Sequence, residues 1–187
     1  MGELEGMERE EGRSVALRAF IGKRQAAASS TDLSAKGLQA LAQRVVEMAQ
    51  AAPEDPYCGL LEARYRASGA SVDLEQSDTA RPNPEQLLDL AKRCEAASLA
   101  IPGIANSSGG GASFDISHFV YATSDGFEGA ESGTSYSLGT QPIAERGDDM
   151  ERDYEYRTRR FFNDLGSPEE IGRMAGERTA RRLGARK

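Results

Sequence analysis

Residues 113–159 read SFDISHFVYATSDGFEGAESGTSYSLGTQPIAERGDDMERDYEYRTR, and polar and apolar side chains alternate along much of this run. Over residues 113–123 the alternation has a period of two, which is typical of a β-strand. Ser-Asp-Gly at 124–126 and Arg-Gly-Asp-Asp at 146–149 are turn-forming sequences. We therefore predict an antiparallel meander with strands over residues 113–123, 133–145 and 150–159. Both faces of this sheet are moderately polar, so it needs a covering layer on at least one face.

Two helices are predicted to flank the meander. Asn83 is a candidate N-cap followed by Pro84 at the first helical position. Ser167 is a second candidate N-cap followed by Pro168, and Glu170 can reach back to the cap's N–H in a capping box. The apolar stripe of the first helix consists of Leu87, Leu88, Ala91 and Cys94. The predicted buried side of the second helix contains Ile171, Met174, Ala175 and Arg178.

A β-hairpin is predicted near the N-terminus. Residues 14–21 alternate as a strand, Gly22-Lys23 can turn the chain, and residues 24–29 continue as a second strand. Residues 4–8 are expected to form another strand beside this hairpin.

A helix is predicted directly after the hairpin. Asp32 and Ser34 are both candidate N-caps. The helix must end near Ala52, because Pro53 cannot continue it. Its apolar face is predicted to contain Leu38, Leu41, Ala42, Val45 and Ala49.

The predicted fold class is α+β: an antiparallel β-hairpin plus a helix, then a helix-flanked antiparallel β-meander. Residues 66–83 are polar and rich in turn-forming residues, as linkers between structural units are. We therefore expect one domain over residues 1–65, a linker over 66–83 and a second domain over 84–187.

The net charge of −7 argues against nucleic-acid binding, because an acidic surface is repelled by phosphates. No run approaches the ~20 apolar residues of a membrane span, and the acidic N-terminus does not resemble a signal peptide. We expect a cytoplasmic protein that binds neither nucleic acid nor membrane.

The sequence carries no recognisable catalytic or metal-binding site. A metallopeptidase needs ligands such as two histidines one helical turn apart, and this chain has one histidine in total, His118. It lies on an apolar strand face, which favours a satisfied core or edge histidine. A Ser-His-Asp triad would need the same residue. The cysteines, Cys58 and Cys94, lack a CxxC spacing and are expected to be reduced and partly buried.

The most unusual local pattern is Glu151-Arg152-Asp153-Tyr154-Glu155-Tyr156, in which charges alternate with tyrosines. Such a strand could pair with a partner strand or an extended peptide. The alternative is an ordinary solvated strand whose tyrosines pack on a neighbour. The candidate contact residues are Arg152, Asp153, Tyr154 and Tyr156.

Motifs along nearly the whole chain resemble those of the PmbA/TldE family. The first domain of that family carries a similar strand, a hairpin like GKRQ (22–25), a helix entry like SSTDLS (29–34) and an exit like APEDPY (52–57). Its central domain carries elements similar to NSSG, SDGF, GTSYS and MERDYEY, which occur in the same order between residues 106 and 156. The last of these elements favours the PmbA/TldE branch over TldD.

The resemblance implies a non-catalytic subunit of a TldD–TldE type metallopeptidase complex that processes extended peptides in the cytoplasm. Zinc is then expected only in the TldD-like partner, and no family catalytic residue matches a position of this sequence. The family is larger than this chain, so we expect the chain to be a fragment without the C-terminal domain. Two alternatives stay open: an active zinc metallopeptidase whose metal motif lies beyond residue 187, and a stand-alone protein-interaction module.

Overall fold

The computed structural model describes residues 4–66 and 72–185. Helices and antiparallel sheets are both present, so the chain is α+β, as its sequence predicts. The described residues form two compact units, with residues 7–66 in the first and residues 4–6 and 72–185 in the second. No helix among the described residues is long and apolar enough to cross a membrane.

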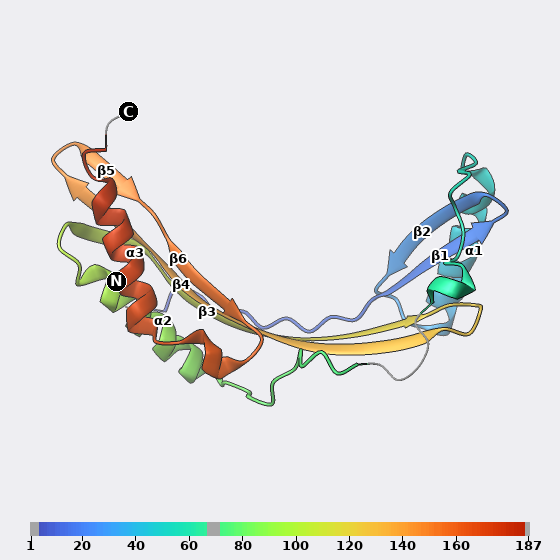
Figure 1. The fold of residues 1–187 in the computed structure, drawn as a ribbon, viewed down its shortest axis with the longest axis horizontal. Coiled ribbons are helices and arrows are strands. Elements are labelled where there is room, and N and C mark those ends of the chain that lie inside the picture. The colour runs from blue at the N-terminus through green and yellow to red at the C-terminus, as the bar shows by residue number, and fades with distance from the viewer. Residues whose placement is uncertain (1–3, 67–71, 186–187) are drawn as a thin grey trace. The chain divides into compact units, whose positions relative to one another are not determined.

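The first unit is a β-hairpin with one helix packed on it (Figure 1). β1 (Val15–Ile21) and β2 (Arg24–Ser30) pair antiparallel around a turn in which Gly22 has a φ of 60°. α1 (Ala35–Ala51) begins after Ser34, whose hydroxyl accepts a hydrogen bond from the Gly37 N–H (3.1 Å). The predicted hairpin and helix are confirmed. The buried residues of α1 are Leu41, Val45 and Ala49.

Two details of the first unit differ from the prediction. Residues 4–14 form no strand, so the strand expected over residues 4–8 is wrong. This segment is dominated by glutamates, which have low strand propensity. Leu38 and Ala42 were expected on the apolar face of α1, but both are exposed.

The second unit is built on a long hairpin of β3 (Ile104–Ala122) and β4 (Glu128–Arg146). β5 (Asp149–Arg152) and β6 (Glu155–Arg159) both pair with the other edge of β4. The antiparallel meander is therefore confirmed. The third predicted strand, however, is interrupted at Asp153 and Tyr154.

β3 begins at Ile104, well before the predicted start at residue 113. The extra length contains the Ser-Ser-Gly-Gly-Gly run at 107–111, which has little intrinsic strand preference. Pairing with β4 imposes the extended conformation there, and the register is irregular between Ser107 and Gly110. Tertiary pairing has overridden local propensity.

Two helices, α2 (Pro84–Leu99) and α3 (Pro168–Arg182), cover one face of this sheet (Figure 1). Asn83 and Gln86 form a complete capping box at α2. The Ser167 hydroxyl caps α3 by accepting from the Glu170 N–H (3.3 Å). A short 3-10 helix, η2 (Phe162–Leu165), links β6 to α3. The buried core cluster consists of Cys94, Tyr136, Leu138, Leu165 and Ile171.

The contact between α2 and α3 depends on glycines. A Cβ atom added to Gly172 would overlap the carbonyl oxygen of Cys94, and one added to Gly176 would lie 2.7 Å from the carbonyl oxygen of Ser98. The two helix backbones therefore approach each other closely along the Gly172–Gly176 spacing. The buried side of α3 consists of these glycines with Pro168, Ile171, Ala175 and Thr179, so the predicted burial of Ile171 and Ala175 is confirmed.

The prediction for α3 is accordingly wrong in part. Arg178 is exposed rather than buried, and Met174 is only half-buried. The Glu170 carboxylate does not close a capping box but lies 3.1 Å from the Arg157 guanidinium.

Residues 76–78 run beside β4, although residues 66–83 were expected to be a linker. The Thr134 N–H donates to the Gln76 carbonyl (3.0 Å), and the Asp78 N–H donates to the Thr134 hydroxyl (2.9 Å). Hydrogen bonds from the Phe162 and Ala80 N–H groups lower the pKa of Asp78. Residues 67–71 lie outside the described residues, and the expected domain boundaries stay a prediction.

Candidate protein-contact face

The sheet of the second unit has one covered and one open face. Side chains from alternate positions of β4 are buried beneath α2 and α3. These buried residues are Thr134, Tyr136, Leu138, Thr140, Pro142 and Ala144. The intervening positions of β4, with their neighbours on β3 and β6, form a face that no helix of this unit covers. We call this surface the open face.

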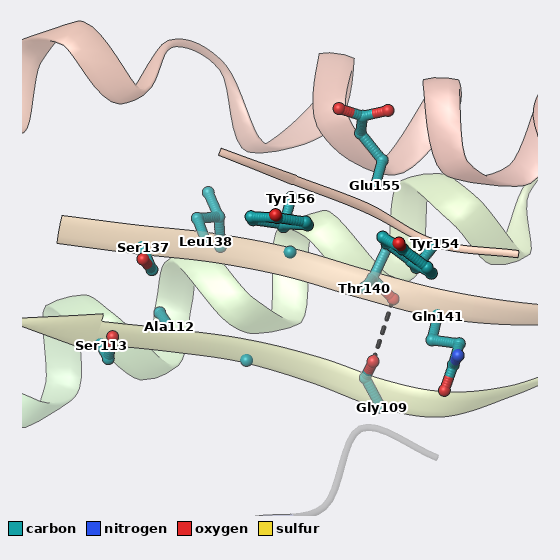
Figure 2. Close-up of a pocket in the computed structure, with 12 residues that line it drawn as sticks. Gly109, Ala112, Ser113, Ser137, Leu138, Thr140, Gln141, Tyr154, Glu155 and Tyr156 are labelled. Carbon is teal, nitrogen blue, oxygen red and sulfur yellow. Dashed lines mark hydrogen bonds between the residues drawn. The ribbon is translucent and has the colours of Figure 1, made fainter. Parts of the chain in front are cut away.

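A shallow groove of about 540 Å³ crosses the open face (Figure 2). Its floor contains Gly111 on β3 and Gly139 on β4, which are directly paired. Tyr154 and Tyr156 form one wall, with their ring centroids 5.9 Å apart. Ser113 and Ser137 extend the floor toward the far end of the hairpin. The groove thus offers a flat floor of small residues beside two aromatic rings.

Gly139 is required at this position by its neighbour. A Cβ atom added there would lie 2.7 Å from both the Glu155 carbonyl oxygen and the Cβ atom of Tyr156. Tyr156 therefore lies close to Gly139, and a larger residue at position 139 would push Tyr156 away. Sequence reasoning missed Gly139, although a glycine facing an aromatic across a strand pair is a usable signal.

The alternation in residues 151–156 separates two kinds of contact. The acidic residues point toward α3, and Figure 2 shows Glu155 turned to the helix while the tyrosines lie over the sheet. Arg178 lies 2.6 Å from Glu155, and Arg182 lies 3.4 Å from Glu151 and 3.2 Å from Asp153. These ion pairs connect the strands to the last turns of α3.

The four candidate contact residues are accordingly divided. Tyr154 and Tyr156 lie together on the open face and are 52% and 62% exposed. Arg152 pairs with Ile143 at an exposed position of the same face. Asp153 lies on the covered side of the sheet beside Arg182 of α3. The structure therefore does not bring Asp153 together with Arg152, Tyr154 and Tyr156.

The environment of Asp153 favours its charged form. Burial is the largest single influence and raises its pKa. Hydrogen bonds from the Tyr154 N–H and the Arg182 guanidinium, with the positive charges of Arg182 and Arg178, outweigh that influence, so the pKa of Asp153 lies below its ordinary value. The carboxylate is therefore a structural partner of α3.

The residue types that could support catalysis lie apart. His118 is exposed on the edge strand β3, with its Nδ1 2.7 Å from the Ser132 hydroxyl, so of the two expected positions the structure gives the satisfied edge histidine. Both cysteines are buried and free of disulfides, and burial raises the pKa of the Cys94 thiol to about 12. Across residues 4–66 and 72–185, no group of three or more His, Cys, Asp or Glu side chains is placed to hold a metal ion.

Comparison with known proteins decides the family. A model of the PmbA/TldA metallopeptidase central domain matches residues 77–183, and a model of domain 1 of the same family matches residues 1–49. The chain belongs to this PmbA/TldD metallopeptidase family.

Among curated relatives in the PmbA/TldD family, Metalloprotease PmbA of Escherichia coli O157:H7 is 33% identical over 187 residues. That match covers 100% of this chain and 41% of the relative. A PmbA homolog of Haemophilus influenzae is 28% identical, covering 99% of this chain and 41% of the homolog. The chain therefore spans about two fifths of the length of these relatives.

Solved structures of the family share the fold. A Bacteroides thetaiotaomicron protein, described as a proposed modulator of DNA gyrase, superposes with a TM-score of 0.76 at 25% identity. The superposition covers 92% of this chain and 40% of the Bacteroides chain. TldE from Thermococcus kodakarensis superposes with a TM-score of 0.67 at 15% identity. This superposition covers 97% of this chain and 39% of the TldE chain.

Proposed function

We propose that this chain is part of a non-catalytic, TldE-like subunit of a TldD–TldE type metallopeptidase complex, which processes extended peptides in the cytoplasm. The match to Metalloprotease PmbA along the whole chain supports the peptidase-family part of the proposal. The observation that carries the subunit role is the likeness to the protein named TldE.

The open face supports a contact role for this part of the subunit. Exposed tyrosines are well suited to protein contacts, because they bring large apolar area and a hydroxyl at low entropic cost. The groove beside Tyr154 and Tyr156 is shallow and floored by glycine and serine, which fits an extended chain better than a compact small molecule. Binding of a peptide or a partner strand there is part of the proposal.

Mixing the purified chain with a TldD-type subunit from the same organism tests the subunit role. The expected result is co-elution on a sizing column, with hydrolysis of an unfolded peptide that depends on the TldD-type subunit. The chain alone is expected to hydrolyse no peptide. Failure to co-elute, or unaided cleavage by the chain alone, would contradict the proposal.

A second candidate function is direct peptide hydrolysis by the longer protein. The relatives are named metalloproteases, which favours an enzymatic role for the family member as a whole. Zinc content and peptidase activity of the full-length protein, measured without any partner, distinguish this candidate. Stoichiometric zinc with activity would favour it over the subunit role.

A further inference from the structure

The β3–β4 hairpin continues as a bare two-stranded ribbon beyond the helices. Figure 1 shows both strands running on past α2 and α3. We call residues 116–132 the arm. Burial beneath the helix layer ends at Thr134, and residues 116–122 are all exposed. Within the described part of this unit, neither face of the arm is buried beneath a helix.

Both faces of the arm carry large apolar side chains. Phe119 and Tyr121 lie on the open face and are 61% and 51% exposed. Ile116 and Val120 lie on the opposite face and are 42% and 74% exposed. A two-stranded ribbon has no interior in which to bury such residues and is marginally stable alone. Apolar side chains gathered on an exposed element indicate a contact surface.

The aromatic residues of the arm lie next to one another. The ring centroids of Phe119 and Tyr121 are 6.4 Å apart, and those of Tyr121 and Phe127 are 6.0 Å apart. Tyr121 pairs with Gly129, and the Phe127 ring lies over this glycine, 3.4 Å from the position that a Cβ atom there would take. Neighbouring aromatic rings present a large continuous contact area, and aromatic residues are enriched in protein interfaces.

The charge of the arm restricts its partner. Residues 101–145 contain no Lys or Arg, whereas the arm carries Asp125, Glu128 and Glu131. Two copies of the arm would place like charges against each other, which opposes self-association. A surface with Lys or Arg around an apolar centre would complement the arm.

We propose that the arm docks on the TldD-type partner, at a surface that is apolar in its centre and basic at its rim. This inference rests on the proposed function and adds the location and chemistry of the contact. The aromatic row and the pair Ile116 and Val120 lie on opposite faces, so the partner holds the arm from both sides.

The test measures the affinity of the full chain for a TldD-type subunit of the same organism. Phe119→Ser with Tyr121→Ser is expected to weaken binding on the order of 100-fold, because buried aromatic contacts dominate interfaces. Glu128→Lys with Glu131→Lys is expected to weaken it about 10-fold at low salt, and less at high salt. The matched control is Tyr57→Ser with Tyr65→Ser, two exposed tyrosines outside both the arm and the groove, which should stay within about 3-fold of wild type.

The outcomes separate the two proposals. If the wild-type chain does not bind, the proposed function is wrong and this inference fails with it. If it binds and both arm variants bind equally well, only the arm inference is overturned. The charge variant decides alone if circular dichroism shows that the serine variant is unfolded. Wild-type dimers that dissociate in the arm variants would also overturn the inference, since the occupant would be a second copy.

Discussion

At the scale of single residues, Gly172 sets the distance between α2 and α3. A methyl group at this position would overlap the Cys94 carbonyl oxygen, and backbone cannot move aside as a side chain can. Gly172→Ala is expected to lower the free energy of unfolding by about 1–3 kcal/mol, the usual effect of overpacking. Urea unfolding measures the change. Gly111→Ala is the matched control, because an added Cβ there meets nothing within 4 Å; equal losses in both variants would contradict the explanation.

Glu169 makes the free energy of unfolding depend on pH in the acidic range. The Arg93 guanidinium (2.7 Å) and the Ser167 hydroxyl lower the pKa of this carboxylate from 4.5 to about 2. Because the folded state binds the proton less readily than the unfolded state, the stabilisation is complete above pH 4.5 and is lost as the pH falls toward 2.

Glu169→Gln should therefore reduce the dependence of the unfolding free energy on pH below 4.5. Urea titrations at pH 5, 4 and 3 measure it, with Glu177→Gln as a control on the same helix. A variant whose stability still falls as steeply as that of wild type would rule out this role for Glu169.

At the scale of secondary-structure elements, helix caps and turns were predicted more accurately than strand boundaries. The caps Ser34, Asn83 and Ser167 and the turn at Ser124–Gly126 were predicted correctly, because each depends on a few neighbouring residues. The early start of β3 could not be predicted, because pairing with β4 imposes it. The pairing of Glu151 in β5 and Glu155 in β6 with α3 was missed for the same reason, since the arginines that they contact follow more than twenty residues later.

The capping box at Asn83 gives a test at this scale. The Asn83 side chain accepts from the Gln86 N–H (2.9 Å), and the Gln86 side chain accepts from the Asn83 N–H (2.9 Å). Asn83→Ala should cost about 1 kcal/mol of stability, because the first turn of α2 loses an acceptor. Thermal unfolding measures the loss, and Asn163→Ala, an exposed asparagine outside both long helices, should be neutral. A neutral Asn83→Ala would show that α2 is held by packing alone.

At the scale of the whole molecule, the sequence predicted the elements better than the site. The two tyrosines of the open face were identified from their alternation, yet Asp153 was grouped with them because alternation alone does not reveal which side α3 covers. The groove floor was missed because Gly111 and Gly139 meet only through the register of β3 and β4.

The division into two units predicts how the molecule unfolds. Each unit has its own buried side chains, with Leu41 and Val45 in the first and Tyr136 and Ile171 in the second. Calorimetry should therefore show two transitions. Leu41→Ala should lower one midpoint and Gly172→Ala the other. A single transition shifted by both substitutions would show that the units unfold as one body.

The break between β5 and β6 has an evolutionary consequence. Glu151 before the break and Glu155 after it both face α3, while Arg152 before it and Tyr156 after it face away, so the two residues of the break preserve the alternation of the chain. Inserting or deleting one residue there would send the tyrosines against the arginines of α3 and the acids out into the solvent. Homologous chains should therefore tolerate length changes of two at this point, but not of one.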